Sequence, residues 1–225
     1  MIAFNLLGTQ KNSGTKTFNI NFFKETINFD YNKKIFVYIP KFYLNDISLK
    51  SSDKIKIIVK SELYNNFFVR FIWLQIILPI ELKIKNVKVL FSSSNYSPFL
   101  LKILNIKSVL FVHSVLPWLH FDLMPGNRIK NFFIKKMMEI SIFISNSIIV
   151  PSKFAKINFI KELNIHPNKI NVINLGADHI SINKNNDDKL IGFDYNQNYI
   201  LSVISCVKYH NILNLFKSYK NFLDQ

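Results

Sequence analysis

The sequence predicts an α/β fold in which a parallel β-sheet carries helices on both faces. Short apolar, β-branched runs alternate with longer helix-like stretches along almost the whole chain. Several of the short runs are apolar throughout, which is expected of strands that are covered on both sides. We find no internal repeat. The alternation of the two kinds of segment therefore favours a layered α/β domain.

Each element of this fold follows from its own pattern. The expected strands are Met1–Leu7, Lys34–Ile39, Ile55–Lys60, Val87–Ser92, Ser108–His113, Ser147–Pro151, Ile170–Asn174 and Tyr199–Ile204. The expected helices are Thr17–Phe29, Asn66–Leu82, Gly126–Phe143, Ser152–Leu163 and Asn211–Leu223. Met1–Leu7 has no basic segment before it, and the polar stretch Gly8–Lys16 follows directly, so we interpret it as the first strand and not as a signal peptide.

The most apolar helix, Phe67–Ile80, raises the question of a membrane span. A span needs about 20 predominantly apolar residues. Arg70 and Glu81 bracket a shorter segment, and Gln75 and Pro79 interrupt even this one. We therefore predict a core helix, with a helix lying on a membrane surface as the alternative.

The length of 225 residues suits one large domain, or one domain and part of another. The polar run Ser181–Lys189 cannot pack a core and reads as a linker. We expect a domain over residues 1–178, a linker over 179–198, and the first βα unit of a truncated second domain over 199–225. One strand and one helix do not make a domain, so the second domain would be largely missing from this chain.

The net charge of +15 comes almost entirely from lysine, since only Arg70 and Arg128 are arginines. A nucleic-acid surface with so little arginine would be unusual, so no nucleic-acid partner is expected. Two interpretations stay open: a solvated lysine-rich surface that reflects composition bias, and attraction to an anionic membrane or a phosphorylated substrate. The lone Cys206 and the absence of a signal peptide predict a cytoplasmic protein.

Residues at the ends of the expected strands are the candidates for chemistry, because ligands of open α/β sheets bind beyond the carboxyl ends. The loop that contains Gly8 and Gly14 joins a strand to a helix and can hold an anion on backbone amides, or it is an ordinary turn that needs glycine. His113 closes an expected strand, and Ser152 stands where a serine would cap a helix. No cluster has metal-ligand spacing, so no metal is expected.

The order of these pieces resembles the N-terminal domain of a GT-B glycosyltransferase of the retaining glycosyltransferase family 4, whose fold is Rossmann-like. The matching segments are Arg70, Gln75 and Pro79, then Val87–Ser92, Ser93–Pro98, Val112-His113, Ser147–Lys156, Lys169–Asp178, Ile200–Ile204 and Tyr209–Asn211. The resemblance rests on this ordered series, because no single motif in it is highly specific.

The resemblance implies transfer of a sugar from a nucleotide-sugar donor to a glycan or lipid-linked acceptor, with retention and without a cofactor or metal. With this function, the basic surface of a cytoplasmic protein would dock peripherally on the inner face of the membrane, unless the charge reflects composition bias alone. By position, His113 would be catalytic, and Gly14, Lys208, His210 and Asn211 would bind the donor. Three further residues would lie on the acceptor side or in the cleft: Ser114, Ser152 and Asp178.

The chain also departs from the family pattern. Ser114 stands where the family usually has Asp, and Ser205 and His210 stand where it often has a basic pair, with Lys208 as a substitute. We therefore expect this chain alone to be inactive or nearly so. The alternative is a degenerate, non-catalytic module that binds a glycan or a partner.

Overall fold

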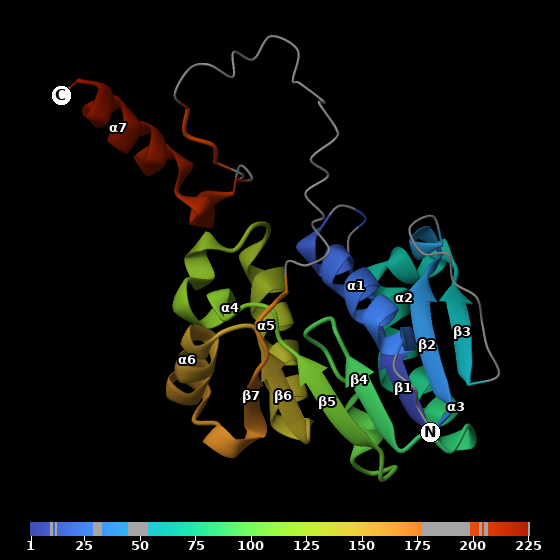
Figure 1. Ribbon diagram of the computed structural model, residues 1–225. Helices are drawn as coiled ribbons and strands as arrows, with labels where there is room; N and C mark the ends of the chain where they lie inside the picture. The colour runs from blue at the N-terminus through green and yellow to red at the C-terminus, as the bar shows by residue number, and fades with distance from the viewer. Residues whose placement is uncertain are drawn as a thin grey trace.

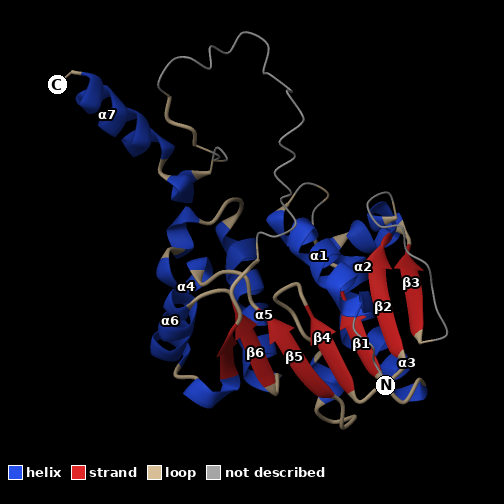
Figure 2. Cartoon of the chain, in the orientation of Figure 1, coloured by secondary structure: helices blue, strands red, loops and turns tan. Residues whose placement is uncertain are grey.

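The computed structural model describes residues 1–9, 11, 13–28, 33–44, 54–176, 199–202, 204 and 207–224. Its strands are β1 (Ile2–Asn5), β2 (Ile35–Pro40), β3 (Ile55–Lys60), β4 (Val89–Ser92), β5 (Lys107–Phe111), β6 (Ser147–Val150) and β7 (Ile170–Val172). The longer helices are α1 (Gly14–Asn28), α2 (Phe67–Ile72), α3 (Leu78–Ile84), α5 (Arg128–Ile144), α6 (Lys153–Leu163) and α7 (Ile212–Leu223). Figure 2 shows how the strands and helices alternate along the chain.

All seven strands form one parallel sheet in the order β3-β2-β1-β4-β5-β6-β7. The chain builds outward from β1 to β3, then crosses back so that β4 pairs with the other side of β1. In the register of these central strands, Asn5 of β1 lies opposite Tyr38 of β2 and Ser92 of β4. The reversal of direction between β1 and β4 is the switch point where open α/β sheets bind ligands. The α/β, Rossmann-like fold class predicted from the sequence is confirmed.

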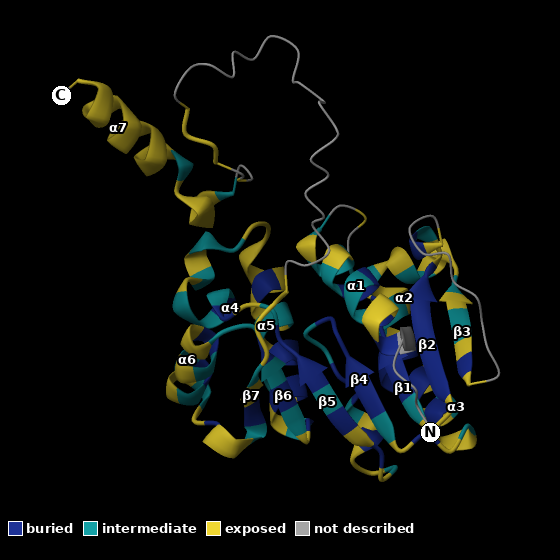
Figure 3. Cartoon of the chain, in the orientation of Figure 1, coloured by how far each residue is buried: buried dark blue, intermediate teal, exposed yellow. Residues whose placement is uncertain are grey.

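Helices cover the two faces of the sheet unequally. On one face, α1 packs Ile20 and Phe23 against Phe4, Val37 and other apolar side chains of the central strands. On the opposite face, η3 (Trp73–Ile77) and α3 cover β1, β2 and β4, while α5 and α6 cover β5, β6 and β7. Figure 1 shows α1 in front of the sheet with α2 and α3 behind it, and Figure 3 shows the buried strands between the exposed outer sides of the helices.

The expected helix Asn66–Leu82 forms as one continuous element of three parts. Asn66 caps α2 by accepting hydrogen bonds from the backbone N–H groups of Phe68 and Val69, at 2.9 and 3.4 Å. A wider π-helical turn, η3 (Trp73–Ile77), then leads into α3. No helix in the described ranges is long and apolar enough to cross a membrane. The burial of Trp73, Leu78 and their neighbours confirms that one side of this helix belongs to the core, while its other side is exposed.

Two expectations for strands are corrected. β5 ends at Phe111, so His113 lies two residues beyond the strand and not at its end. Tyr199–Ser202 and Ile204 are described but belong to no strand. The apolar pattern over Tyr199–Ile204 suits a strand, yet a strand forms only where another strand satisfies its backbone hydrogen bonds. No such neighbour exists for this segment among the described residues. The proposed linker at 179–198 lies outside the described ranges.

Candidate functional site

The loops that follow β1 and β4 meet at the switch point, on the carboxyl edge of the sheet. The backbone N–H of Ser93 donates to the carbonyl of Asn5 at 3.2 Å, and its hydroxyl donates to the same oxygen at 3.3 Å. The hydroxyl of Ser94 donates to the carbonyl of Leu7. Two consecutive serines of the β4 loop therefore continue the pairing of β1 and β4 beyond the strands.

Gly8 allows the β1 loop to approach these serines. Its φ is +98°, and a Cβ at this position would lie 3.0 Å from Cβ of Ser94 and 3.7 Å from Nε of Arg70. A Cβ atom in a real structure rarely lies 3.0 Å from another side chain's Cβ, and residues other than glycine rarely adopt this φ. Of the two glycines in the predicted loop, Gly8 is thus the one that the turn requires.

We expect Gly8→Ala to lower the free energy of unfolding by about 1–3 kcal/mol, because the change adds both backbone strain and a clash with Ser94. Gly14→Ala is the matched control. Gly14 begins α1 in open space without a positive φ, so its replacement should change stability by less than about 1 kcal/mol. Urea unfolding measures both values, and equal losses would contradict the strain argument.

Polar side chains beneath the β1 loop hold it in place. Asn19 is fully buried, and its Nδ2 donates to the carbonyl of Leu6 at 3.3 Å and to the Tyr43 hydroxyl at 3.0 Å. The Tyr43 hydroxyl lies 2.8 Å from Oγ1 of Thr9. Because buried polar groups are stable only when paired, this network fixes the path of the loop from Leu6 to Thr9.

His113 is held at the edge of the sheet by contacts with three neighbouring segments. Its backbone N–H donates to Oδ1 of Asn95 at 2.9 Å. Its Nε2 lies 2.7 Å from the carbonyl oxygen of Ser93, and its ring packs against Phe18 and Phe111 with centroids 5.3 and 4.6 Å away. Because a carbonyl oxygen can only accept, Nε2 must carry the proton in the neutral ring. Nδ1 is then an acceptor, and no described residue forms a hydrogen bond with it.

Burial lowers the pKa of His113, although the bond to Ser93 acts in the opposite direction. A histidine with a lowered pKa binds its proton less readily in the folded state than in the unfolded state. Its contribution to stability is therefore complete above the unfolded pKa of about 6.5 and is lost as the pH falls through the lower folded pKa. His113 is the neutral imidazole at neutral pH.

We expect the free energy of unfolding to fall below about pH 6.5, and His113→Gln to remove part of that fall. Denaturant unfolding at a series of pH values measures the effect. His120→Gln is the control, because His120 is exposed and has no side-chain hydrogen bond in the described part of the chain. A pH dependence that is the same in both variants would exclude His113 as its source.

Arg70 brings a positive charge to the switch point. Its Nη1 donates to the backbone carbonyls of Tyr64 and Asn65, each at 3.2 Å, and its Nε points towards Gly8. No Asp or Glu within the described ranges forms an ion pair with it. Burial lowers the pKa of Arg70 and raises that of the neighbouring Tyr96 to about 12, while each of the two groups opposes the shift of the other. An arginine with this environment can bind an anionic group of a ligand.

The other predicted site residues on the sheet domain have local structural roles. Gly14 begins α1, directly after Ser13, whose hydroxyl accepts from the N–H of Lys16 at 3.2 Å. Ser114 is exposed, and its hydroxyl accepts from the N–H of Leu116 at 3.1 Å. Ser152 caps α6, as the sequence predicts, by accepting from the N–H of Ala155 at 3.1 Å. Their predicted contacts with a ligand stay predictions.

The predicted donor-binding residues lie near the end of the chain. Lys208 and His210 belong to a short 3-10 helix, and Asn211 precedes α7 in the left-handed conformation, with φ +54°. All three are exposed. Among the described residues, Lys208 and Asn211 form no hydrogen bond with His113 or with the loop at Gly8. Asp178 lies outside the described residues.

Sequence reasoning missed the residues that hold the site together. Asn95 and Ser93 fix His113, and Asn19 fixes the β1 loop. Arg70 was noted in the sequence as a charge at the end of an apolar segment and as part of the family resemblance, but not as a site residue. Asn95 carried one usable signal, since a left-handed residue just after a strand, here at φ +65°, is often Asn.

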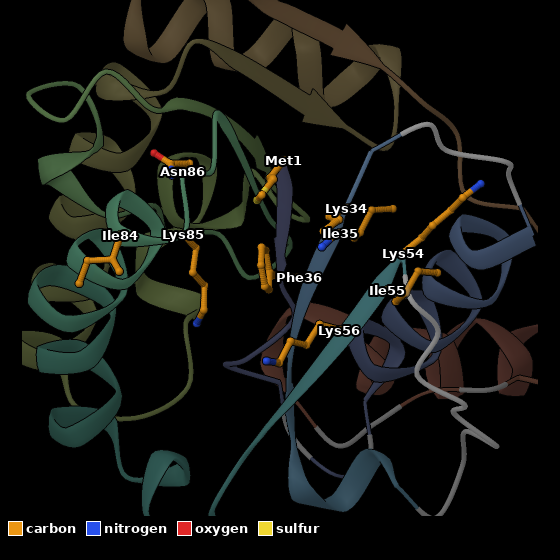
Figure 4. A pocket seen from close by; sticks show the side chains of 10 residues that line it. All are labelled: Met1, Lys34, Ile35, Phe36, Lys54, Ile55, Lys56, Ile84, Lys85 and Asn86. Atoms are coloured by element: carbon orange, nitrogen blue, oxygen red, sulfur yellow. The ribbon is translucent and has the colours of Figure 1, made fainter.

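A hollow lies at the opposite, amino edge of the sheet. It is lined by Lys34, Lys54, Lys56 and Lys85 around Phe36, at the starts of β2 and β3 and the end of α3, as Figure 4 shows. Glu81 forms an ion pair with Lys85. This hollow is remote from the carboxyl edge, where ligands of such sheets bind, and takes no part in the candidate site.

Comparison with known proteins identifies no family for this chain. No protein-family model matches the chain, and no curated protein matches it. One of twelve chains of similar solved structures is the UDP-GlcNAc 2-epimerase from Methanocaldococcus jannaschii, at 16% sequence identity and a TM-score of 0.48. The similarity covers 77% of this chain and 45% of that one, so the chain spans less than half the length of the epimerase. Glycosyltransferase family 4 membership stays a prediction.

Proposed function

We propose that this chain belongs to a sugar-transferring enzyme that uses a nucleotide-sugar donor and a glycan or lipid-linked acceptor, with retention at the anomeric carbon. The observation that carries the proposal is the neutral His113 beside the switch point, with Nε2 bound to Ser93 and Nδ1 left as an acceptor. The ordered series of segments that resembles retaining transferases supports it. The chemistry requires neither a metal nor a cofactor.

The orientation of His113 assigns it a specific role. Nδ1 can accept a hydrogen bond from a sugar hydroxyl and so orient the ring of the transferred sugar. Its lone pair also favours the positive charge that develops on the sugar in an oxocarbenium-like transition state. Because Nε2 is held by the Ser93 carbonyl, the ring cannot rotate to donate this proton to the leaving group without losing that bond.

The developing negative charge of the leaving diphosphate needs a separate partner. The loop through Gly8 leads to the N-terminus of α1, where backbone N–H groups and the helix dipole favour an anion. Arg70 lies beside the same loop. We propose that the loop with Gly14 faces the donor phosphates, and that Lys208, His210 and Asn211 complete the donor site from the C-terminal segment.

A titration followed by NMR tests the proposal on the 225-residue chain. We expect a nucleotide sugar or an acceptor sugar to shift the ring signals of His113 and the amide signal of Gly8, and to leave those of the exposed His120 and His166 unchanged. A panel of uridine, guanosine and adenosine diphosphate sugars identifies the donor. If none of these ligands shifts His113, the assignment of the site is wrong.

A non-catalytic glycan-binding module is the second candidate. Ser114 stands where the resembled family has Asp, and its hydroxyl is engaged with the backbone of Leu116. A module of this kind would bind an acceptor glycan in the same titration, and the intact protein would transfer no sugar from any donor. Transfer activity that depends on His113 would exclude it.

A further inference from the structure

The outer side of the helix from Phe67 to Ile84 is apolar although it faces away from the core. Phe68, Ile72, Ile76, Ile80 and Ile84 follow one another at intervals of four residues, and each is 51–75% exposed. Residues four apart are neighbours on a helix surface, so these five side chains form one continuous row along the helix. Ile77, in the wider turn η3, adds to the same face at 48% exposure. We call these six residues the apolar stripe; it extends over about 24 Å.

The apolar stripe continues onto α5, which covers the same face of the sheet. The Phe133 ring contacts Phe67 and Phe71 at 6.5 and 6.4 Å between centroids, so the first turns of α2 and α5 touch. The exposed side of α5 is also apolar; it carries Ile129, Phe132, Phe133, Ile140 and Phe143. Exposed apolar surface that is continuous over two helices indicates an interaction surface in a folded protein.

The charges around this surface are almost all positive. Apart from Arg70, which lies at the switch point, the segments 67–85, 99–107 and 128–144 hold eight Lys and Arg residues and two acidic ones. Both acidic residues are paired: Glu81 with Lys85 and Lys60, and Glu139 with Lys136. Burial and the nearby charge of Lys102 lower the pKa of Lys169, whose Nζ donates to the last turn of α5 at the Phe143 carbonyl. The surface therefore repels cations and attracts anions.

We propose that this face, the apolar stripe together with the outer side of α5, docks onto an anionic lipid membrane. An interfacial protein inserts apolar side chains among the lipids while basic side chains contact the anionic headgroups. A second copy of the chain is a poorer occupant, because a symmetric contact would bring two positively charged surfaces together. The proposal stands apart from the sugar chemistry, since it rests on neither His113 nor the loop at Gly8.

Vesicle flotation tests this surface on the full chain. The probes are phosphatidylcholine vesicles with and without about one third phosphatidylglycerol, at physiological salt. We expect binding to the anionic vesicles to be at least about tenfold tighter than to the neutral ones. Replacing Ile72, Ile76 and Ile80 together by Gln should weaken the anionic binding by at least about tenfold.

The control carries Ile173→Gln and Leu175→Gln, two exposed apolar residues that follow β7. It should bind the vesicles as the unchanged chain does. Circular dichroism checks that both variants fold. We expect both to do so, because only exposed side chains are changed. Loss of binding in the control as well would show nonspecific adsorption and overturn the proposal.

Three other results would also overturn it. In the first, the chain does not float with anionic vesicles. In the second, the triple variant binds as well as the unchanged chain, which would mean that the lysines attract the membrane but the apolar side chains do not insert. In the third, sedimentation shows a dimer that the triple variant abolishes, while vesicle binding is absent. This last result would assign the apolar stripe to a second copy of the chain.

Discussion

Leu78→Ala is expected to lower the free energy of unfolding by about 3–5 kcal/mol. Leu78 is fully buried at the first turn of α3, where it packs with Leu82, Leu90 and the rest of the core behind the sheet. The change removes three carbon atoms from a site that rigid strands and a helix surround. The cavity cannot collapse easily, so the cost includes both the lost burial and the void.

The same helix supplies the control. Ile76→Ala removes a side chain of similar size two residues earlier, but Ile76 is 52% exposed on the apolar stripe. We expect its unfolding free energy to change by less than about 0.5 kcal/mol. Urea or thermal unfolding compares the two variants. A similar large loss in both would mean that the apolar stripe is covered in solution, which would contradict its assignment as an exposed surface.

The central part of the sheet was predictable from the sequence because its strands are largely buried on both faces. Runs such as Ile35–Pro40 are apolar in every position, and no exposed face introduces alternation. The boundaries differ by one or two residues where the last apolar residues belong to the loop, as at Val112 and His113 after β5. Tyr199–Ile204 shows the limit of this reasoning, since an apolar run does not make a strand without a neighbour.

The sequence predicted only those site residues whose position follows from their place directly after a strand. His113 follows a strand, so its place at the carboxyl edge could be inferred. The partners of its ring and backbone, Ser93 and Asn95, come from the loop of a neighbouring strand some twenty residues earlier. Which loop lies beside His113 depends on the sheet order, and a single sequence does not state that order. The helix Phe67–Ile84 is apolar on both its core side and its exposed side. The sequence alone therefore did not show which apolar residues are buried; the side-chain burial in the structure shows it.

His113→Ala should lower the rate of sugar transfer by the intact protein by about 100-fold, if His113 orients the sugar as proposed. The loss should appear mainly in kcat, because the contact of Nδ1 strengthens as charge develops on the sugar. His113→Asn is the matched variant. The amide oxygen of Asn can accept a hydrogen bond from the sugar, so this variant should be faster than His113→Ala. His120→Ala, a change at an exposed histidine, should have no effect.

The pH profile of the same reaction separates this role from simple loss of folding. The neutral imidazole is the active form, and burial lowers the pKa of His113, so the rate should stay constant down to below about pH 6.5 and then fall as the ring is protonated. His113→Asn cannot be protonated in this range, so its lower rate should not show that acidic limb. An identical acidic limb in the Asn variant would mean that another group titrates, and that His113 only supports the loop after β5.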